Sequence, residues 1–298
     1  MAEPEIVCSI SPTQPQPVLL AVQHIRKLTG NTQAHLMRAS DGNLYVTKFS
    51  NNPLGIRVLA SEFLATKIGL FVGLPMPEVA VIEVPSFLID NTPGLQMETE
   101  DREVIRCASG RHLAVRYVGD VWKDRVFDYM PKAMFGRVSN KADFLRILPF
   151  DKWLGNCDDR QAVYVSRAGK RQYQAIFIDQ HDCFDGAKWQ FLDDPMMGTH
   201  SAKHVYEGVT GWNSFEPMLT QVEGVAPGNL WQLASEIPVE WYGGDHDALC
   251  CLIETLFKRR SVIRDLITTF SKCARHPFPQ WDESGLAIDK QLNREVKR

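Results

Sequence analysis

The chain has 298 residues, of which 44% are hydrophobic and 23% are charged, and both fractions are ordinary for a globular protein. At about 150 residues per domain, this length predicts about two structural units. Lysines and arginines number 33 against 36 acidic residues, which gives a net charge of −3. This balance excludes a protein that binds nucleic acid mainly by electrostatic attraction, because such proteins carry a basic excess.

The N-terminal segment has no features of a secretion signal. Residues 1–16 contain Glu3, Glu5 and several prolines, whereas a signal peptide begins with basic residues and continues into an apolar run of about 7–15 residues. The sequence also lacks the roughly 20 consecutive apolar residues that cross a bilayer. We therefore expect a cytoplasmic protein without a membrane partner.

The beginning of the sequence predicts an antiparallel sheet. Residues 17–26 form an apolar run with β-branched members, which favours a strand. Residues 29–31 have the composition of a turn, and residues 34–39 and 44–49 are two further strands. Asp41–Gly42 between them is the dipeptide of a tight hairpin turn.

A helix follows this sheet. From Arg57 the apolar residues recur at helical spacing, and Gly69 and Gly73 stand where such a helix would end. The other features predicted before residue 120 are strands over residues 79–84 and 112–118 and a polar surface excursion over residues 89–106.

The second half of the sequence is mostly helical. Ser139 or Asn140 is expected to cap a helix that continues to Trp153. Two short apolar runs separated by a turn predict a second hairpin, over residues 162–178. Residues 245–270 carry a continuous apolar stripe and predict a long helix.

These patterns predict an α+β fold with an N-terminal and a C-terminal part. The N-terminal lobe is an antiparallel sheet plus one helix over residues 17–120. The C-terminal lobe is mostly helical over residues 121–272, and residues 273–298 are a polar tail.

Two charged residues of the N-terminal lobe predict an ion pair. Lys48 ends the apolar strand 44–49, and burying its ammonium group costs several kcal/mol unless an anion is paired with it. Glu62 lies in the next helix between apolar Leu59 and Phe63 and is the candidate anion. The alternative for each residue is a solvated surface charge.

Two acidic segments follow in the C-terminal lobe. Adjacent Asp158 and Asp159 lie in a polar loop, and because they repel each other they need a cation, an arginine or full exposure. Asp179 directly ends an apolar strand, which is a common way to aim a carboxylate oxygen at Mg²⁺. The alternative for both segments is an ordinary surface turn.

The order of these features along the chain is that of protein-kinase-like phosphotransferases. In such enzymes a strand lysine neutralises nucleotide phosphates, and a helix glutamate fixes the lysine. A loop aspartate accepts the proton of the substrate hydroxyl, and a second aspartate holds the metal.

Three stretches carry a resemblance to a known family. They are GLFVGLPMP at residues 69–77, FDKWLGNCDDRQAVYV at 150–165 and IDQHDCF at 178–184. Over most of residues 18–270, the sequence resembles the HipA-like and phosphatidylinositol-kinase-like branch of the kinase superfamily, and it is most similar to bacterial HipA-like kinase-domain proteins. The resemblance implies a protein-kinase-like fold with ATP and Mg²⁺ in the cleft between two lobes.

The resemblance also implies roles for individual residues. Lys48 contacts the phosphates, Glu62 orients Lys48, Asp158 is the base and Asp179 binds the metal. The remaining implied nucleotide contacts are Gly30 and Thr32 in the phosphate loop and Val118, Gly119 and Asp120 near the adenine.

The sequence departs from the family pattern after the candidate base. Arg160 stands where the family commonly has His, and Val163 stands where it has a metal-binding Asn if Asp158 is the base. If Asp159 is the base instead, the corresponding residue is Tyr164, which is no better a ligand. The missing oxygen is then expected from the amide of Asn156 or Gln161.

These observations favour an ATP- and Mg²⁺-dependent phosphotransferase that acts on a hydroxyl of a protein substrate, whose identity the sequence leaves open. One alternative is a catalytically degraded kinase that binds nucleotide and regulates a partner protein. A second alternative is a lipid kinase of the phosphoinositide type, which is disfavoured because the sequence has no basic amphipathic membrane-binding face.

Overall fold

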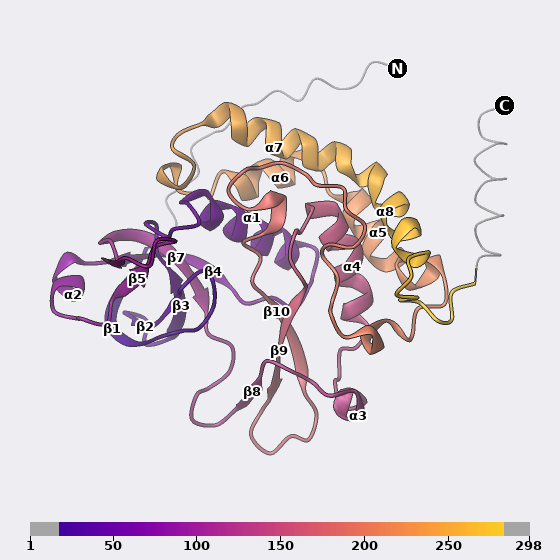
Figure 1. The fold of residues 1–298 in the computed structure, drawn as a ribbon, viewed down its shortest axis with the longest axis horizontal. Helices are drawn as coiled ribbons and strands as arrows, with labels where there is room; N and C mark the ends of the chain where they lie inside the picture. The colour runs from indigo at the N-terminus through magenta and orange to yellow at the C-terminus, as the bar shows by residue number, and fades with distance from the viewer. Residues whose placement is uncertain (1–17, 283–298) are drawn as a thin grey trace.

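The computed structural model describes residues 18–282, which combine strands and helices along the chain (Figure 1). Residue 17 of the predicted N-terminal lobe and residues 283–298 of the predicted tail lie outside this range. Among the described residues, no helix is both long and apolar enough to cross a membrane.

Five strands close into a barrel, at the left of Figure 1, in the order β1, β2, β3, β7 and β4. These strands are β1 (Leu19–Lys27), β2 (His35–Ala39), β3 (Leu44–Lys48), β7 (Gly110–Arg116) and β4 (Val79–Val84). Neighbouring strands pair antiparallel, except that β1 and β4 pair in parallel with Leu19 opposite Ile82. The predicted strands are present, and their closure into a barrel protects their edges.

The hairpin between β2 and β3 turns at the predicted dipeptide. Gly42 adopts a φ of +80°, and Asp41 Oδ1 accepts a hydrogen bond from the Asn43 backbone N–H at 3.0 Å. The Tyr45 hydroxyl donates to Asp41 Oδ2 at 2.8 Å. This turn sets the register of β2 and β3, in which His35 lies opposite Thr47. On its other edge, β3 pairs with β7, and Lys48 lies opposite Leu113.

The segment predicted as a polar surface excursion is folded onto the barrel. It includes the end of α2 (Ser86–Asp90) and the hairpin of β5 (Gln96–Glu98) and β6 (Val104–Arg106). Leu95 and Met97 are fully buried in the barrel core. The prediction is therefore wrong for these residues, because a few apolar side chains among many acidic ones are enough to hold the hairpin against the barrel.

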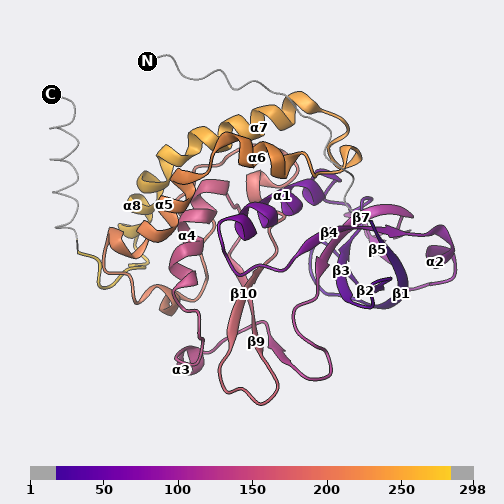
Figure 2. The same cartoon turned by 180° about the vertical axis from the view of Figure 1, so that it is seen from behind.

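Helix α1 (Arg57–Phe71) lies between the barrel and the other helices in both Figure 1 and Figure 2. It is buried on nearly all sides, including the positions of Ser61 and Glu62. Two ion pairs fasten its ends to the second half of the chain. Arg57 Nη2 lies 2.7 Å from Asp245 Oδ2, and Lys67 Nζ lies 2.7 Å from Glu236 Oε2.

The second half of the chain packs helices against a small antiparallel sheet. The sheet consists of β8 (Arg125–Phe127), β9 (Gln161–Ser166) and β10 (Gln174–Ile178). The helices are α3 (Lys132–Phe135), α4 (Asp143–Leu154), α5 (Glu216–Gly224), α6 (Pro227–Ala234), α7 (His246–Arg259) and α8 (Ile263–Ser271). Short 3₁₀ turns are η1 (Cys183–Asp185), η2 (Lys203–Tyr206), η3 (Trp212–Ser214), η4 (Val239–Tyr242) and η5 (Arg260–Val262).

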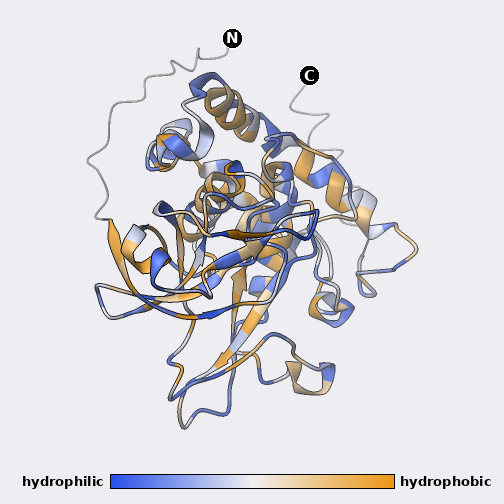
Figure 3. Ribbon diagram, turned by 60° about the vertical axis from the view of Figure 1, so that its left-hand side comes forward, coloured by the Kyte–Doolittle hydropathy of each residue, from blue (hydrophilic) through white to orange (hydrophobic). Residues whose placement is uncertain are grey.

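The long helix predicted over residues 245–270 is two helices, α7 and α8, separated by η5. Arg260 begins this 3₁₀ turn, and its Nη1 donates to the carbonyls of Glu223 at 2.7 Å and Val225 at 3.0 Å. The apolar stripe continues through both helices, which show alternating hydrophilic and hydrophobic colours in Figure 3. The hydrophobic periodicity therefore predicts the buried face correctly and misses the break.

Asn140 also differs from its predicted role as a helix cap. Helix α4 begins only at Asp143. The Asn140 side chain instead accepts a hydrogen bond from the Ala175 backbone N–H at 2.8 Å and donates to the Ala175 carbonyl at 2.9 Å. It thereby fastens the start of α4 to strand β10.

Candidate active site

Lys48 and Glu62 form the ion pair that the sequence predicts. Lys48 Nζ lies 2.5 Å from Glu62 Oε2, and both side chains are at most 6% exposed. The pair forms because β3 ends at Lys48 while α1 packs against the barrel with Glu62 on its buried side. A buried ammonium and a buried carboxylate need each other, since either one left alone in this place carries a large desolvation cost.

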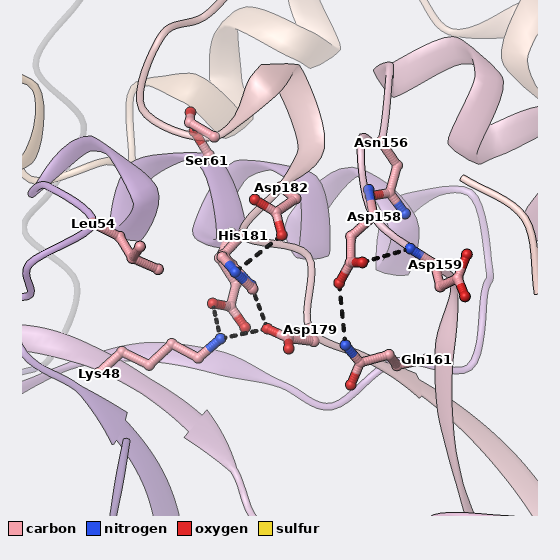
Figure 4. A network of polar contacts seen from close by, with 12 residues as sticks. Lys48, Leu54, Ser61, Asn156, Asp158, Asp159, Gln161, Asp179, His181 and Asp182 are labelled. Atoms are coloured by element: carbon pink, nitrogen blue, oxygen red, sulfur yellow. Dashed lines mark hydrogen bonds and ion pairs between the residues drawn. The ribbon is translucent and has the colours of Figure 1, made fainter. Parts of the chain in front are cut away.

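Asp179 joins this pair from the end of β10. Its Oδ1 lies 2.7 Å from Lys48 Nζ and 2.5 Å from His181 Nδ1 (Figure 4). Asp179 has a φ of +63°, a left-handed conformation that costs energy for most residues and that aspartate tolerates better than most. This conformation turns the chain sharply after β10 and brings the carboxylate back toward Lys48.

The charges of this cluster shift one another's pKa values. Burial by itself raises the pKa of Asp179, but Lys48 and His181 outweigh it and hold that pKa well below its usual range. Burial by itself lowers the pKa of Lys48, but the carboxylates of Glu62 and Asp179 have the larger effect. The pKa of Lys48 is therefore above its usual value, and the lysine is charged at neutral pH. Burial likewise disfavours the charged form of His181, yet its hydrogen bond to Asp179 raises its pKa overall.

A cavity of about 240 Å³ opens onto this cluster. Lys48, Glu62 and Asp179 line its charged end. The rest of its wall is mainly apolar and includes Ala34, Val46, Val115, Val118, Val126, Val163 and Ile178. A cavity with an apolar wall and one charged end suits a ligand that joins a flat apolar group to an anion.

Only some of the predicted nucleotide contacts line this cavity. Thr32 and Val118 line it directly. Gly119 and Asp120 line a neighbouring surface pocket, which shares Arg116 and Tyr117 with this cavity. Gly30 is not among the lining residues, and it adopts a φ of +130° in the turn that precedes Thr32.

The loop after α4 carries Asp158. Its backbone is held by two contacts, because Cys157 N–H donates to the Asp182 carbonyl at 3.1 Å and Gly198 N–H donates to the Asp158 carbonyl at 3.1 Å. The Asp158 side chain accepts hydrogen bonds from Asp159 N–H at 2.7 Å and from Gln161 Nε2 at 3.3 Å. Figure 4 shows the Asp158 carboxylate turned toward the side of Asp179 and Gln161.

The loop also contains Arg160, whose ion-pair partner was not predicted from the sequence. Its guanidinium does not pair with Asp158 or Asp159 but forms a two-pronged ion pair with Asp151 of α4, in which both side chains are 0% exposed. Arg160 Nη1 also donates to the Ile178 carbonyl at 3.0 Å, one residue before Asp179. Asp158 and Asp159 are exposed, so exposure relieves their mutual repulsion.

The metal roles predicted for Asn156 and Gln161 stay predictions. Asn156 is buried, and its Oδ1 accepts from Asp158 N–H at 3.1 Å while its Nδ2 donates to Asp151 at 3.2 Å. Gln161 is exposed and lines the cavity. The residues that the structure brings together as possible metal ligands are Glu62, Asp179 and His181, whose ligand atoms all lie within 4.8 Å of one another. From the sequence, His181 was expected to be a solvated turn residue, with tuning of the metal site as the alternative. The structure buries it beside Asp179.

Comparison with known proteins identifies one matching protein family. The model of the HipA-like kinase family matches residues 22–268, and no curated protein matches the chain significantly.

Several solved structures match the chain at low sequence identity. The structure of hydra Fam20 with sugar is 12% identical, covers 91% of this chain and 90% of its own, and gives a TM-score of 0.48. The Helicobacter pylori proinflammatory kinase CtkA is 13% identical, with coverages of 82% and 99% and a TM-score of 0.48. The Golgi casein kinase with Mn/ADP bound is 11% identical, with coverages of 86% and 74% and a TM-score of 0.47.

Proposed function

This chain belongs to the HipA-like kinase family, and from that premise we propose that it is an ATP- and Mg²⁺-dependent phosphotransferase whose acceptor is a hydroxyl group of a protein. The proposal includes a two-lobed arrangement with the active site between the barrel and the helical part. It also assigns the cavity beside Lys48 to the adenine nucleotide.

The observation that carries the proposal is the cluster of Lys48, Glu62 and Asp179 at one end of a cavity whose remaining wall is mainly apolar. The apolar wall suits a purine base, and Lys48 is the buried cation that would meet the phosphates. Glu62 fixes the lysine at 2.5 Å, so the ammonium is oriented before any ligand arrives. Such preorganised charge is the main source of catalysis in phosphoryl transfer, where the protein contributes positioning and electrostatic stabilisation.

The residues at this end of the cavity also suit a divalent cation. Both contacts of the Asp179 carboxylate use Oδ1, so Oδ2 is the atom of Asp179 that would ligate it. Magnesium prefers such oxygen ligands and, when bound, neutralises charge on the transferred phosphoryl group. In this assignment Glu62 keeps its place beside Lys48 and His181 fixes the orientation of Asp179 through its 2.5 Å contact.

Asp158 is the proposed base. Its carboxylate accepts hydrogen bonds from a backbone N–H and from the Gln161 amide, which orient it on the side of Asp179. Its part in the reaction is to hold the acceptor hydroxyl and to accept its proton as the oxygen attacks the γ-phosphorus of ATP. The bond from that phosphorus to the bridging oxygen breaks in the same transfer, and ADP leaves.

One observation favours a second function, a nucleotide-binding regulator without turnover. Val163 lines the cavity at the place where the family has a metal-binding Asn if Asp158 is the base. An isopropyl group cannot ligate a cation, so the second metal contact of an active kinase would have to come from elsewhere in the site.

A phosphotransfer assay separates the two functions. The purified chain is incubated with γ-labelled ATP and Mg²⁺, alone and with a cell lysate, beside Asp158→Asn, Asp179→Asn and the matched control Asp128→Asn, an exposed acid outside the site. Label transfer by the wild type and the control, and loss of it in both site variants, is the expected result.

Binding of ATP is measured in parallel by thermal shift. Stabilisation by ATP without label transfer, under Mg²⁺ or Mn²⁺, would favour the regulator. Loss of transfer in Asp159→Asn and not in Asp158→Asn would move the role of the base to Asp159.

A further inference from the structure

A second, smaller pocket lies on the other side of the loop that carries Asp158. Figure 4 shows the side chains of Asp158 and Asp159 leaving this loop in different directions, with Asp159 turned away from Asp179. Asp159 lines a pocket of about 160 Å³ together with His200, Lys203, Phe270 and Arg275. This pocket shares no lining residue with the cavity beside Lys48.

The wall of this pocket is joined directly to the loop of the proposed base. Arg160 N–H donates to the Thr199 carbonyl at 2.9 Å, and Gly198 N–H donates to the Asp158 carbonyl at 3.1 Å. A Cβ atom on Gly198 would lie 2.9 Å from the Asp151 Cβ, so the segment passes close against α4 and the base loop. The pocket therefore borders the loop that carries the proposed base.

The pocket has two cations that are not neutralised. Lys203 and Arg275 are exposed, and within residues 18–282 neither forms an ion pair. Burial lowers the pKa of His200 to about 4, so this histidine is neutral at pH 7. Asp159 is the acid among the lining residues, and the lining as a whole keeps a positive charge.

We propose that this pocket binds an anionic side chain of the protein acceptor, a carboxylate or a phosphorylated residue, at a short distance along the chain from the hydroxyl that is phosphorylated. The inference rests on the proposed function and names the class of its substrate: an acceptor segment with an acidic group near the phosphorylation site. The size of the pocket suits one such group. Lys203 and Arg275 supply the donors, and Arg275 can bind a carboxylate or phosphate with two parallel hydrogen bonds.

The test measures peptide binding directly, so that it does not depend on turnover. Fluorescein-labelled peptides carry one serine with glutamate at successive neighbouring positions, and matched sets carry glutamine or phosphoserine at those positions. Binding is followed by fluorescence anisotropy for the wild type, Lys203→Gln, Arg275→Gln and the double variant. The double variant Lys170→Gln/Arg171→Gln, in the exposed turn between β9 and β10, is the control with the same change of charge.

The wild type and the control should bind the best glutamate peptide more tightly than its glutamine match. Because exposed ion pairs are worth about 0.2–1 kcal/mol each, we expect about threefold weaker binding in each single variant and about tenfold in the double variant. The preference should also shrink as salt concentration rises. Tighter binding of the phosphoserine set would identify a phosphorylated residue as the anion, and tighter binding of the glutamate set would identify an acidic side chain.

If neither the glutamate nor the phosphoserine peptides bind more tightly than the glutamine peptides, or if the control loses as much binding as the pocket variants, the inference is overturned. Tighter binding of a single-stranded RNA than of either acidic peptide set would overturn the assignment to a protein acceptor. A preserved preference for acidic peptides without ATP binding or label transfer would contradict the proposed function while leaving the anion pocket in place.

Discussion

The buried ion pair of Asp151 and Arg160 should contribute strongly to the stability of the fold, and it should hold the candidate base loop against α4. Its two side chains are 0% exposed, and Arg160 Nε donates to Asp151 Oδ2 at 2.9 Å. In Arg160→Met, Asp151 keeps only the Asn156 amide at 3.2 Å as a donor among the described side chains. Removing one partner of a buried pair costs about 3–5 kcal/mol because it leaves an uncompensated charge. This is a large part of the roughly 5–15 kcal/mol that stabilises a typical protein.

Urea denaturation, followed by circular dichroism, measures this loss. Arg160→Met should lower the free energy of unfolding by about 3–5 kcal/mol. The double variant Asp151→Leu/Arg160→Met removes both charges and should recover most of the loss, because a hydrophobic pair of similar volume replaces a buried ion pair at little cost. Arg167→Met is the control, since Arg167 is 71% exposed and Asp124 keeps the hydrogen bonds from the Asp120 and Ala168 backbone N–H groups when the arginine is lost. We expect this control to lose about 0–1 kcal/mol.

Two results would refute this reasoning. One is a loss in Arg160→Met no larger than in Arg167→Met. The other is a double variant less stable than both single variants, which would mean that packing or the hydrogen bond to the Ile178 carbonyl, and not charge compensation, carries the effect.

Three further outcomes follow from individual contacts. His35 and His112 are fully buried, and burial lowers the pKa of each to about 4. Because the unfolded state then binds more protons, stability should fall as pH drops from about 6.5 to about 4, and His112→Gln should flatten this dependence in urea titrations at successive pH values. Gly155 has a φ of +58°, and a Cβ atom there would lie 2.8 Å from Phe191 Cδ1. Gly155→Ala should therefore lower the melting temperature. The control Gly136→Ala should not lower it, because a Cβ atom on Gly136 meets no atom within 4 Å. The Ser61 hydroxyl donates to the Gly186 carbonyl at 2.7 Å and accepts from Trp189 Nε1 at 2.9 Å; Ser61→Ala should cost about 1–3 kcal/mol of unfolding free energy, and a loss below that range would show that these groups find other partners.

The central charges of the candidate site were predictable because each stands at a place where its neighbours are apolar. A lysine that ends an apolar strand and a glutamate between Leu59 and Phe63 must be solvated or paired, and the structure pairs them at 2.5 Å. Asp179 was predicted from its position directly after a buried strand. The catalytic, nucleotide and metal roles of these residues remain predictions for the experiments above.

The partner of Arg160 was not predictable in the same way. Adjacent Asp158 and Asp159 are the acids closest to it in sequence, yet it pairs with Asp151 on the preceding helix. The choice depends on how α4 and β10 approach each other, since the same guanidinium also reaches the Ile178 carbonyl. Periodicity in the sequence contains no information about that approach.

By itself, the sequence determined the local elements, the hairpin at Asp41–Gly42, and the family to which the chain belongs. Turn chemistry, the apolar period and short motifs are properties of neighbouring residues, so they can be recognised before folding is considered. Only the tertiary structure decided the closure of the barrel, the break at η5 and the positions of the two pockets on either side of the Asp158 loop. These features depend on contacts between residues far apart in the chain, whose distances are fixed only when the hydrophobic surfaces of the barrel, α1 and the helices are packed together.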